Sequence, residues 1–576
     1  AIAVALMLRE DHGFTTLVIC PKNLVGMWED HLEQYDVIGK VVPYSMVQKK
    51  LPGTKRHQLV IIDESHTIRN SETIAHQAIA DYIRENESNA LLLTATPYNK
   101  RYLDVANQLS MYIDPDDDLG LAPMEAIRKN AGLIDKVDGK ITTLAAFSRS
   151  EEPEDWRRLM SEHLVRRTRS FIRENYAEKD EDGREFLPFA DGNRFYFPDR
   201  FARPLSHAFG ESDPARLMAE DSTLDAVNGL KLPRYHLSNY VRSDVVAKDD
   251  DGQILARLQR SSGNLIGFTR TSLFKRLASC GNSFIVSLQR QLDRNRLYLY
   301  ALEHGLPLPV GAILQGQIDI DSDEDPDEMG DLGDDASNPE RHYDALRSRS
   351  PKTIKWVASD LFTEELREDL KTDSGVIAGL LELFGDWDVS SDSKIDALVE
   401  LLTETHPNEK LLIFSEYKDT VDYVTAALRA RGVTDAEGVS GATSDPTKVA
   451  RRFAPVSNRR LQGSLSDDEL RVLVTTDVLS EGQNLQDAHI VVNYDLPWAI
   501  IRLIQRAGRV DRVGQESSEV LVYTFLPDDD VESVLDLRGR IRRRLVENAT
   551  VFESDEAFFG DEKEQTQIRG LYAGRL

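Results

Sequence analysis

The amino-acid sequence predicts an α/β protein with two parallel-sheet domains and a long, mainly helical region between them. Two groups of short apolar runs predict the sheets, one before residue 115 and the other after residue 386. Runs that are apolar throughout are typical of parallel strands, because helices cover both faces of such a sheet. Segments with helical spacing separate the runs, which gives the strand–helix–strand order of an open parallel sheet.

The two groups of apolar runs set the predicted boundaries. We expect an N-terminal sheet domain at 1–115, a helical insertion at 116–385, a second sheet domain at 386–528 and a C-terminal helical extension at 529–576. In the first domain the strand candidates are Thr16–Cys20, Gln58–Ile62 and Asn89–Leu93. In the second domain they are Lys410–Phe414, Arg471–Thr475, His489–Asn493 and Val520–Phe525.

Three further segments have a helical or linker character. Leu273–Tyr300 alternates apolar and basic residues at helical spacing, which favours a packed helix pair over a clamp on DNA. The stretch 317–340 is strongly acidic and is typical of a mobile linker. An amphipathic helix is expected at about Val531–Asn548.

Composition limits the classes of protein that fit. The chain has 576 residues, a net charge of −28 and a sequence pI near 4.9. This strongly acidic balance argues against non-specific electrostatic binding to nucleic acid by the surface as a whole. Basic clusters remain at Arg157–Arg173 and Arg538–Arg544, and an acidic proteome such as that of a halophile is a second explanation of the charge. No apolar run reaches the ~18 residues of a membrane span.

Cysteine and histidine usage excludes two kinds of site. Cys20 and Cys280 are too few for a disulfide framework or a metal cluster, and we expect both to be core thiols. The histidines lack the spacing of a zinc site. A cytoplasmic location is the expectation that follows.

Polar residues follow two strand candidates of the first domain, at the end of a parallel sheet where ligands bind. Asp63, Glu64 and His66 come directly after one strand, and Thr94 and Thr96 after the next. A carboxylate there can hold Mg²⁺ through water, and a second can activate an attacking water. An ordinary acidic turn and an ordinary strand exit are the alternatives.

The second domain has matching positions. Thr476, Ser480, Glu481 and Gly482 follow the strand candidate that ends at Thr475. Gly482 would let the backbone approach a phosphate closely, although an ordinary helix cap is the alternative.

The segment Gln505–Gln515 carries two arginines, Arg509 and Arg512, three residues apart. On a helix this spacing would place both side chains on one side, where they could reach a triphosphate bound to the other domain. A solvated basic helix end is the alternative.

One expected element is missing from the printed sequence. A nucleotide motor cradles phosphates with a loop of the form G-x-x-x-x-G-K-[ST], which does not occur in these residues. The helix that follows such a loop would fit Ala1–Glu10, so we expect a fragment that begins just after the loop. We therefore expect residues 1–576 alone to be inactive as an ATPase.

The ordered set of motifs resembles the superfamily 2 helicase-like ATPases, and within them the SWI/SNF-type translocases of double-stranded DNA. The motifs are Ile19–Pro21 with Trp28, Asp63–His66 with Ile68–Asn70, Leu93–Pro97, Leu164–Thr168, Phe414–Tyr417, Ser440-Gly441, Thr476-Asp477 with Ser480–Gly482, and Gln505–Gln515. Asn484–Gln486 and Asn493–Trp498 look closest to a bacterial branch that includes an RNA-polymerase-recycling ATPase and helicase halves of restriction or phage-defence proteins.

The resemblance implies a fold and a set of roles. Both sheet domains would be RecA-like, and the cofactors would be ATP and Mg²⁺. Asp63 would hold Mg²⁺, Glu64 would activate water, and Arg509 and Arg512 would reach the γ-phosphate with Gln505 beside them. His66 and Gly482 would also line the nucleotide site. Coupling to nucleic acid would fall to Thr94, Thr96, Ser415, Ser440, Thr476, Ser480 and Glu481.

The resemblance also implies a function, a motor that hydrolyses ATP and moves along duplex DNA by backbone contacts without strong sequence specificity. The insertion would offer sites for protein partners. A strand-separating DNA or RNA helicase is one alternative, and a non-catalytic nucleic-acid-binding or docking module on the same fold is another. Ser65 and Asn99 depart from the family pattern, and the insertion matches it only near Arg166 and Arg167.

Overall fold

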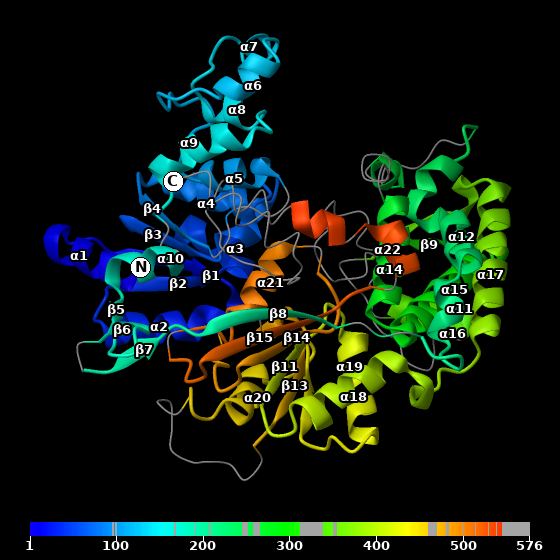
Figure 1. The fold of residues 1–576 in the computed structure, drawn as a ribbon. Coiled ribbons are helices and arrows are strands. Elements are labelled where there is room, and N and C mark those ends of the chain that lie inside the picture. The colour runs from blue at the N-terminus through cyan, green and yellow to red at the C-terminus, as the bar shows by residue number, and fades with distance from the viewer. Residues whose placement is uncertain are drawn as a thin grey trace.

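The computed structural model contains two parallel sheets and a separate bundle of helices (Figure 1). It describes residues 1–94, 97, 101–165, 169–189, 192–205, 207, 209–244, 251–256, 265–310, 338–348, 354–458, 469–479, 483–497, 499–512, 514–527, 529–536 and 538–543. The acidic stretch predicted as a linker lies almost wholly outside these residues. Within the described part of the chain, no helix is long and apolar enough to cross a membrane.

The first sheet has four parallel strands in the order β2-β1-β3-β4. They are β1 (Thr16–Cys20), β2 (Gly39–Pro43), β3 (Leu59–Asp63) and β4 (Asn89–Leu93). The three strands predicted from apolar runs are confirmed. The prediction missed β2, whose first two residues are exposed at the sheet edge and carry no apolar signal.

Helices cover both faces of the first sheet, as its apolar strands require. Alternate residues of β1 and β3 face α4 (Ile74–Glu85) on one side. The others face α1 (Ile2–His12) and α2 (Val25–Gln34) on the opposite side. Beyond this sheet lie α5 (Tyr102–Leu109), α6 (Met124–Lys129), α7 (Leu133–Lys136), α8 (Leu144–Phe147) and α9 (Pro153–His163). Of these, α5, α8 and α9 share a small core around Trp156.

The second sheet has six strands, all paired in parallel, in the order β12-β13-β11-β14-β15-β8. Its strands are β11 (Leu411–Phe414), β12 (Ala436–Val439), β13 (Val472–Thr475), β14 (Ile490–Asn493), β15 (Glu519–Phe525) and β8 (Asp199–Leu205). The four predicted strands are confirmed. Helices α18 (Ser393–Glu400), α19 (Lys418–Ala430) and α20 (Pro446–Phe453) belong to the same domain.

Strand β8 comes from the region predicted as the insertion. It follows α10 (Arg169–Tyr176) and a small antiparallel sheet of β5 (Glu178–Lys179), β6 (Glu185–Pro188) and β7 (Arg194–Tyr196). Figure 1 shows β8 running along the edge of the second sheet from the side of the first domain toward the helical bundle. The chain thus contributes to the second sheet before it enters the bundle. The domain boundaries themselves stay a prediction.

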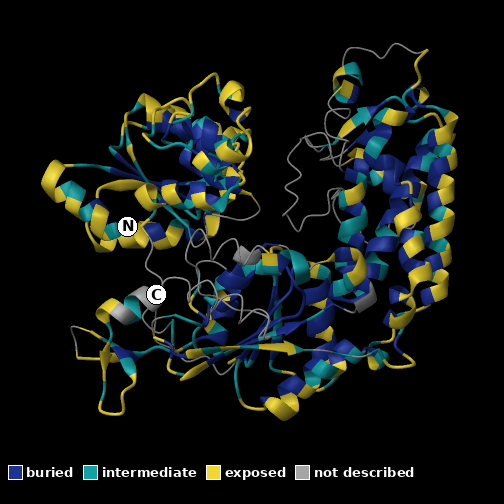
Figure 2. Ribbon diagram, turned by 45° about the horizontal axis from the view of Figure 1, so that its top comes forward, coloured by how far each residue is buried: buried dark blue, intermediate teal, exposed yellow. Residues whose placement is uncertain are grey.

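The helical bundle packs directly on the second sheet domain. Its main helices are α14 (Leu265–Ser279), α15 (Gly281–Glu303) and α17 (Glu364–Phe384), with α11 (Ala215–Ala219), α12 (Asp221–Gly229) and α16 (Pro339–Ser348) around them. The packed helix pair predicted within Leu273–Tyr300 is confirmed, with Cys280 capping the start of α15. One hydrophobic core runs from Phe284 in the bundle to Phe414 and Val491 in the sheet. Figure 2 shows these buried faces as dark blue.

The C-terminal helix differs from its prediction. Helix α22 (Asp529–Leu535) ends at Asp536, whose φ of 46° lies in the left-handed region that interrupts a helix. A further helical stretch follows at residues 538–543. The expectation of one continuous helix over Val531–Asn548 is therefore wrong at Asp536, and its end lies outside the described residues.

Candidate active site

The acidic corner after β3 has an unusual backbone. Glu64 adopts φ 51° and ψ 48°, a left-handed conformation that is uncommon for a residue with a side chain. Such a conformation costs about 1–3 kcal/mol and persists where neighbouring contacts impose it. Here Asp63 Oδ1 accepts a hydrogen bond from the Glu64 amide at 3.0 Å, and Thr67 Oγ1 donates to the Glu64 carbonyl at 2.9 Å. The corner thus directs two adjacent carboxylates from one strand end.

Neighbouring side chains fix the orientation of Asp63. Trp28 Nε1 donates to Asp63 Oδ2 at 2.8 Å, and the Tyr44 hydroxyl donates to the Asp63 carbonyl. Burial raises the pKa of the Cys20 thiol to about 12, with the Asp63 charge adding to the effect. Cys20 therefore stays protonated beside the carboxylate, as expected of a core thiol. Both cysteines are buried and free.

His66 links the acidic corner to the end of the next strand. Its Nδ1 lies 3.2 Å from Thr94 Oγ1 and 3.4 Å from Glu64 Oε2. Ser65 Oγ donates to Gln108 Oε1 at 2.9 Å, and the Gln108 amide donates to the Pro97 carbonyl at 2.7 Å. The structure therefore brings together the two strand ends that the sequence singled out. Thr96 lies outside the described residues.

The arginine pair lies on a turn and not on a helix. Helix α21 (Ile500–Ala507) ends before Arg509, so the expected helical placement of Arg509 and Arg512 is wrong. Gly508 ends the helix, and Gly514 adopts a φ of 100° that few other residues tolerate. Both arginines nevertheless lie on one side, because Nη1 of each approaches the Gln483 carbonyl, at 3.3 Å and 3.5 Å.

The turn brings one arginine near the acidic corner of the other domain. Burial lowers the pKa of the Arg512 guanidinium below its ordinary value, and the negative charge of Glu64 opposes that effect. Glu64 therefore lies within electrostatic range of Arg512, although the two belong to different sheets. Arg509 and Gln505 are buried, at 5% and 7% exposure.

A second arginine position was missed by the sequence analysis. Arg506 is fully buried and donates to both carboxylate oxygens of Asp477, at 2.7 Å and 3.0 Å. Arg502 also donates to Asp477, at 3.1 Å. The very apolar neighbours of Arg506 on α21 were a signal that this side chain faces the core. Asp477 follows the end of β13, and Arg506 belongs to α21. Their ion pair therefore holds α21 against the end of β13.

Three of the predicted coupling residues of the second domain lie where strands end. Ser415 Oγ donates to Asp495 Oδ2 at 2.5 Å, and the Thr476 amide donates to the Val439 carbonyl at 3.0 Å. The Ser440 amide donates to Thr443 Oγ1 at 3.0 Å. These contacts place the three at neighbouring strand ends of one sheet. Ser480, Glu481 and Gly482 lie outside the described residues.

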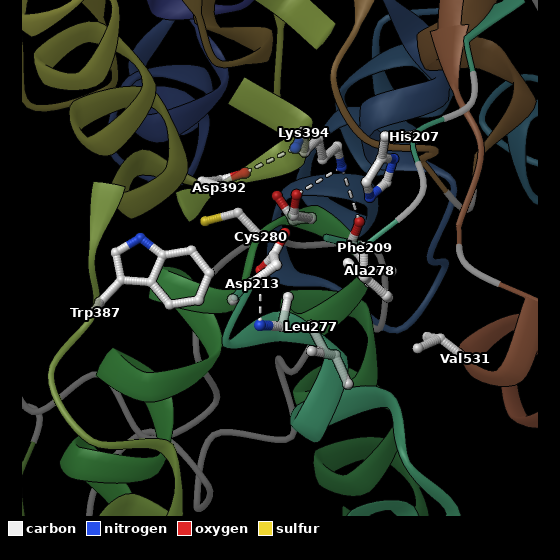
Figure 3. Close-up of a pocket in the computed structure, with 13 residues that line it drawn as sticks. His207, Phe209, Asp213, Leu277, Ala278, Cys280, Trp387, Asp392, Lys394 and Val531 are labelled. Carbon is white, nitrogen blue, oxygen red and sulfur yellow. Dashed lines mark hydrogen bonds between the residues drawn. The ribbon is translucent and has the colours of Figure 1, made fainter. Parts of the chain in front are cut away.

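A polar joint connects the bundle to this sheet. Lys394 Nζ donates to the carbonyls of Ala278 and Ser279, at 3.1 Å and 2.7 Å, and Ser279 Oγ donates to Asp495 Oδ2 at 2.6 Å. Burial lowers the pKa of Lys394 to about 8. Lys394 lines a pocket that is drawn in Figure 3, and the cavity of this pocket is about 30 Å³. That volume suits a water molecule and excludes a nucleotide.

The described residues do not form a complete metal cage. No group of three or more His, Cys, Asp or Glu side chains there could hold a metal ion. Mg²⁺ does not require such a cage, because it keeps several waters and binds one or two carboxylates together with substrate phosphates. The chemistry of Asp63, with Glu64 beside it, fits that type of site.

Part of the second domain is similar to a known protein family. The family model described as "Helicase conserved C-terminal domain" matches residues 393–514. This segment lies mostly within the second sheet domain and is similar to that family. The matched segment, hereafter called the helicase module, contains Asp477, Arg506, Arg509 and Arg512, and therefore the arginine turn.

Curated relatives are also helicases. The chain is 25% identical over 232 residues to a protein of Bacillus subtilis named "Uncharacterized ATP-dependent helicase YqhH", a match that covers 39% of this chain and 38% of that protein. It is 29% identical over 192 residues to "ATP-dependent RNA helicase eIF4A" of Mycosarcoma maydis, covering 33% and 43%. The chain spans less than half the length of these relatives. Both matches are to proteins named as ATP-dependent helicases, and neither covers more than 39% of this chain.

A solved structure was also compared, the "Sulfolobus solfataricus SWI2/SNF2 ATPase core in complex with dsDNA". It is 15% identical and covers 98% of this chain and 89% of that one, with a TM-score of 0.28. A TM-score this low carries no argument about fold or function. The α/β fold with two parallel-sheet domains rests on the strand pairing described above.

Proposed function

We propose that the protein is an ATP-driven translocase of SWI/SNF type that moves along duplex DNA. One observation carries the proposal, namely that two adjacent carboxylates, Asp63 and Glu64, stand at the end of β3 in one sheet domain while Arg509 and Arg512 share one side of a turn in the other. A carboxylate pair on one α/β domain and an arginine pair on the other match the parts of a phosphoryl-transfer site. The ordered motifs and the helicase module supply the rest of the support.

The residues of this chain have distinct roles in the proposal. Asp63 holds Mg²⁺, and Trp28 keeps the Asp63 carboxylate in one orientation. Glu64 accepts a proton from water, while Arg509 and Arg512 hold the terminal phosphate, with Gln505 beside them. Gly482 and His66 complete the lining, and ATP supplies the phosphoanhydride bond that is cleaved.

Coupling to DNA would run through the strand ends. His66 joins the acidic corner to Thr94, so a change at Glu64 reaches the neighbouring strand end. We place the backbone contacts to DNA near Thr96, Ser415, Ser440, Thr476, Ser480 and Glu481. Contacts of this kind read phosphates and therefore give little sequence specificity.

The test is ATP hydrolysis by the natural full-length polypeptide, with and without linear duplex DNA. Duplex DNA should stimulate turnover, and Glu64→Gln should lower it about 10²–10⁴-fold, since the general base is lost. Glu72→Gln, which changes an exposed carboxylate of the same domain, is the matched control. An ATP hydrolysis rate that does not change when duplex DNA is added, or that stays at the wild-type level in Glu64→Gln, would contradict the proposal.

A strand-separating helicase is the second candidate, because the curated relatives include proteins named RNA helicases. Two displacement assays separate the candidates. A translocase displaces the third strand of a triplex and leaves the duplex paired, whereas a helicase releases one strand of the duplex. ATP-independent binding without either activity would favour a non-catalytic docking module.

A further inference from the structure

We propose that Arg200 of strand β8 is a positioning residue that holds the arginine turn in its working geometry. The inference rests on the proposed function, because it concerns the turn that carries Arg509 and Arg512. The observation behind it is a buried ion pair between Arg200 and Asp511, which lies between those two arginines in sequence. The partners are 311 residues apart.

The sheet places Arg200 with fixed register. Strand β8 pairs in parallel with β15 over seven residue pairs, from Asp199 opposite Glu519 to Leu205 opposite Phe525. The Asp199 amide donates to the Ser518 carbonyl at 2.9 Å, and the Leu526 amide donates to the Leu205 carbonyl at 3.1 Å. Arg200 therefore stands beside the start of β15, which begins shortly after the turn ends at Gln515.

The ion pair has the features of a structural anchor. Arg200 Nε and Nη2 both donate to Asp511 Oδ2, at 3.0 Å and 2.7 Å. The Asp511 side chain is fully buried and that of Arg200 is 19% exposed. Charge-assisted hydrogen bonds of this kind are about twice as strong as neutral ones. Removing Arg200 would leave a buried carboxylate without this partner, which is costly.

Other contacts hold the two ends of the turn. At its start the amides of Val510 and Asp511 donate to the Ala507 carbonyl, at 3.3 Å and 3.1 Å. At its end the Gln515 side-chain amide donates to the carbonyls of Gln486, Ala488 and Val510. Arg200 donates to Asp511 in the middle of the turn. Arg200 itself lies outside residues 393–514, the segment that matches the helicase family.

Position matters here because phosphate contacts depend on sub-ångström geometry. A displacement of about 1 Å in a group that aligns reactants can lower turnover on the order of 10²-fold. Asp511 is one residue from Arg512 and two from Arg509, so a shift of Asp511 moves both. The strand from the preceding region thereby sets the reach of the arginine pair toward the other domain.

The experiment uses charge reversal and its repair in the full-length protein. Arg200→Asp and Asp511→Arg should each lower kcat for ATP on the order of 10–100-fold. The double variant Arg200→Asp with Asp511→Arg should recover most of the loss, because the pair is restored with opposite polarity. Arg203→Asp, on the exposed face of the same strand, is the matched control and should retain kcat.

A second measurement does not depend on hydrolysis. Hydrogen–deuterium exchange of the peptide that covers 506–515 should speed up in Arg200→Gln and return to the wild-type rate in Arg200→Lys. Unchanged exchange in Arg200→Gln, or a double variant no better than either single one, would overturn the inference about Arg200. A wild-type protein without ATPase activity would instead count against the proposed function and leave the exchange result decisive for Arg200.

Discussion

The two sheet domains hold their candidate site residues in different ways. In the first domain the acidic corner is fixed by side chains of that domain, Trp28, Tyr44 and Thr94 among them. In the second domain several contacts come from the preceding part of the chain. Arg200 grips the arginine turn, and Ser279 and Lys275 reach Asp495 and Glu416 at the strand ends.

The hydrophobic cores repeat this difference. The two faces of the first sheet have their own cores, which include its covering helices. One face of the second sheet instead shares a continuous core with the bundle. A change in the bundle can therefore reach the arginine-bearing domain through packed side chains and ion pairs. The acidic corner has no such shared core with the bundle among the described residues.

The largest effect should come from the charge pair at the centre of the second domain. Burial raises the pKa of Asp477, but Arg506 and Arg502 outweigh it and leave that pKa below its ordinary value. Asp477→Ala leaves the fully buried Arg506 without its main counterion and should cost about 3–5 kcal/mol. Denaturant unfolding monitored by exchange in β13 and α21 measures this, with exposed Asp422→Ala as control.

If the second domain made no contacts with the bundle, Asp477→Ala would speed up hydrogen exchange only within the second sheet domain. We expect faster exchange in α14 as well, because Arg502 also contacts Glu416, which pairs with Lys275 of α14. Full protection of α14 in this variant would show that the bundle is independent of α21.

An intermediate effect is expected at the joint between bundle and sheet. Asp419, at the start of α19, accepts hydrogen bonds from Arg276 of α14 and Arg290 of α15. Burial raises the pKa of Asp419, but Arg290 and Arg276 more than offset this, so the folded pKa lies below the ordinary 3.8. Asp419→Asn should cost about 2 kcal/mol at neutral pH, since two charge-assisted contacts weaken.

The pH dependence gives the sign of this effect. A carboxylate with a lowered folded pKa contributes its full stability above its unfolded pKa, and the contribution is lost as pH falls through the folded pKa. The difference between wild type and Asp419→Asn should therefore be constant near pH 7 and shrink below about pH 4. Asp422→Asn, whose side chain is 57% exposed, is the matched control. A difference that grows on acidification would contradict the assignment.

The smallest effect should come from the first domain. Trp28→Phe removes the indole donor to Asp63 while keeping an aromatic ring, and should cost about 1 kcal/mol. Exchange should speed up in β3 and α2 and stay unchanged in the bundle and the second sheet. Spread of the effect into the second sheet would remove the contrast between the two domains.

Much of the fold was predictable because seven strands are mostly apolar runs. Within the two parallel sheets of the described residues, the prediction missed the three strands β2, β8 and β12, and β8 shows why. It reads Asp199-Arg200-Phe201-Ala202-Arg203-Pro204-Leu205, with charges and a proline that only an edge strand tolerates. Nothing in those residues indicates which strand they pair with. The partner β15 comes only after the chain has passed through the whole bundle and most of the second sheet.

The site was predictable where its residues follow a strand, as Asp63 and Thr94 do. The placement of Arg509 and Arg512 was predicted for the wrong reason, since their spacing fits a helix but Gly508 ends it. Arg506 was missed because its partners Asp477 and Asn493 come from two other strand ends. The roles of the site residues in catalysis stay a prediction.

The position of strand β8 in the sequence also sets the order in which the second sheet can fold during synthesis. The ribosome makes Arg200 long before its partner Asp511, which lies 311 residues later. At a translation rate of about 5–20 residues per second, the wait is on the order of half a minute. During that time β8 has no neighbouring strand of the second sheet to pair with. The edge of that sheet can therefore form only late in synthesis. A nascent chain that stalls before β15 would leave β8 unpaired and able to bind chaperones.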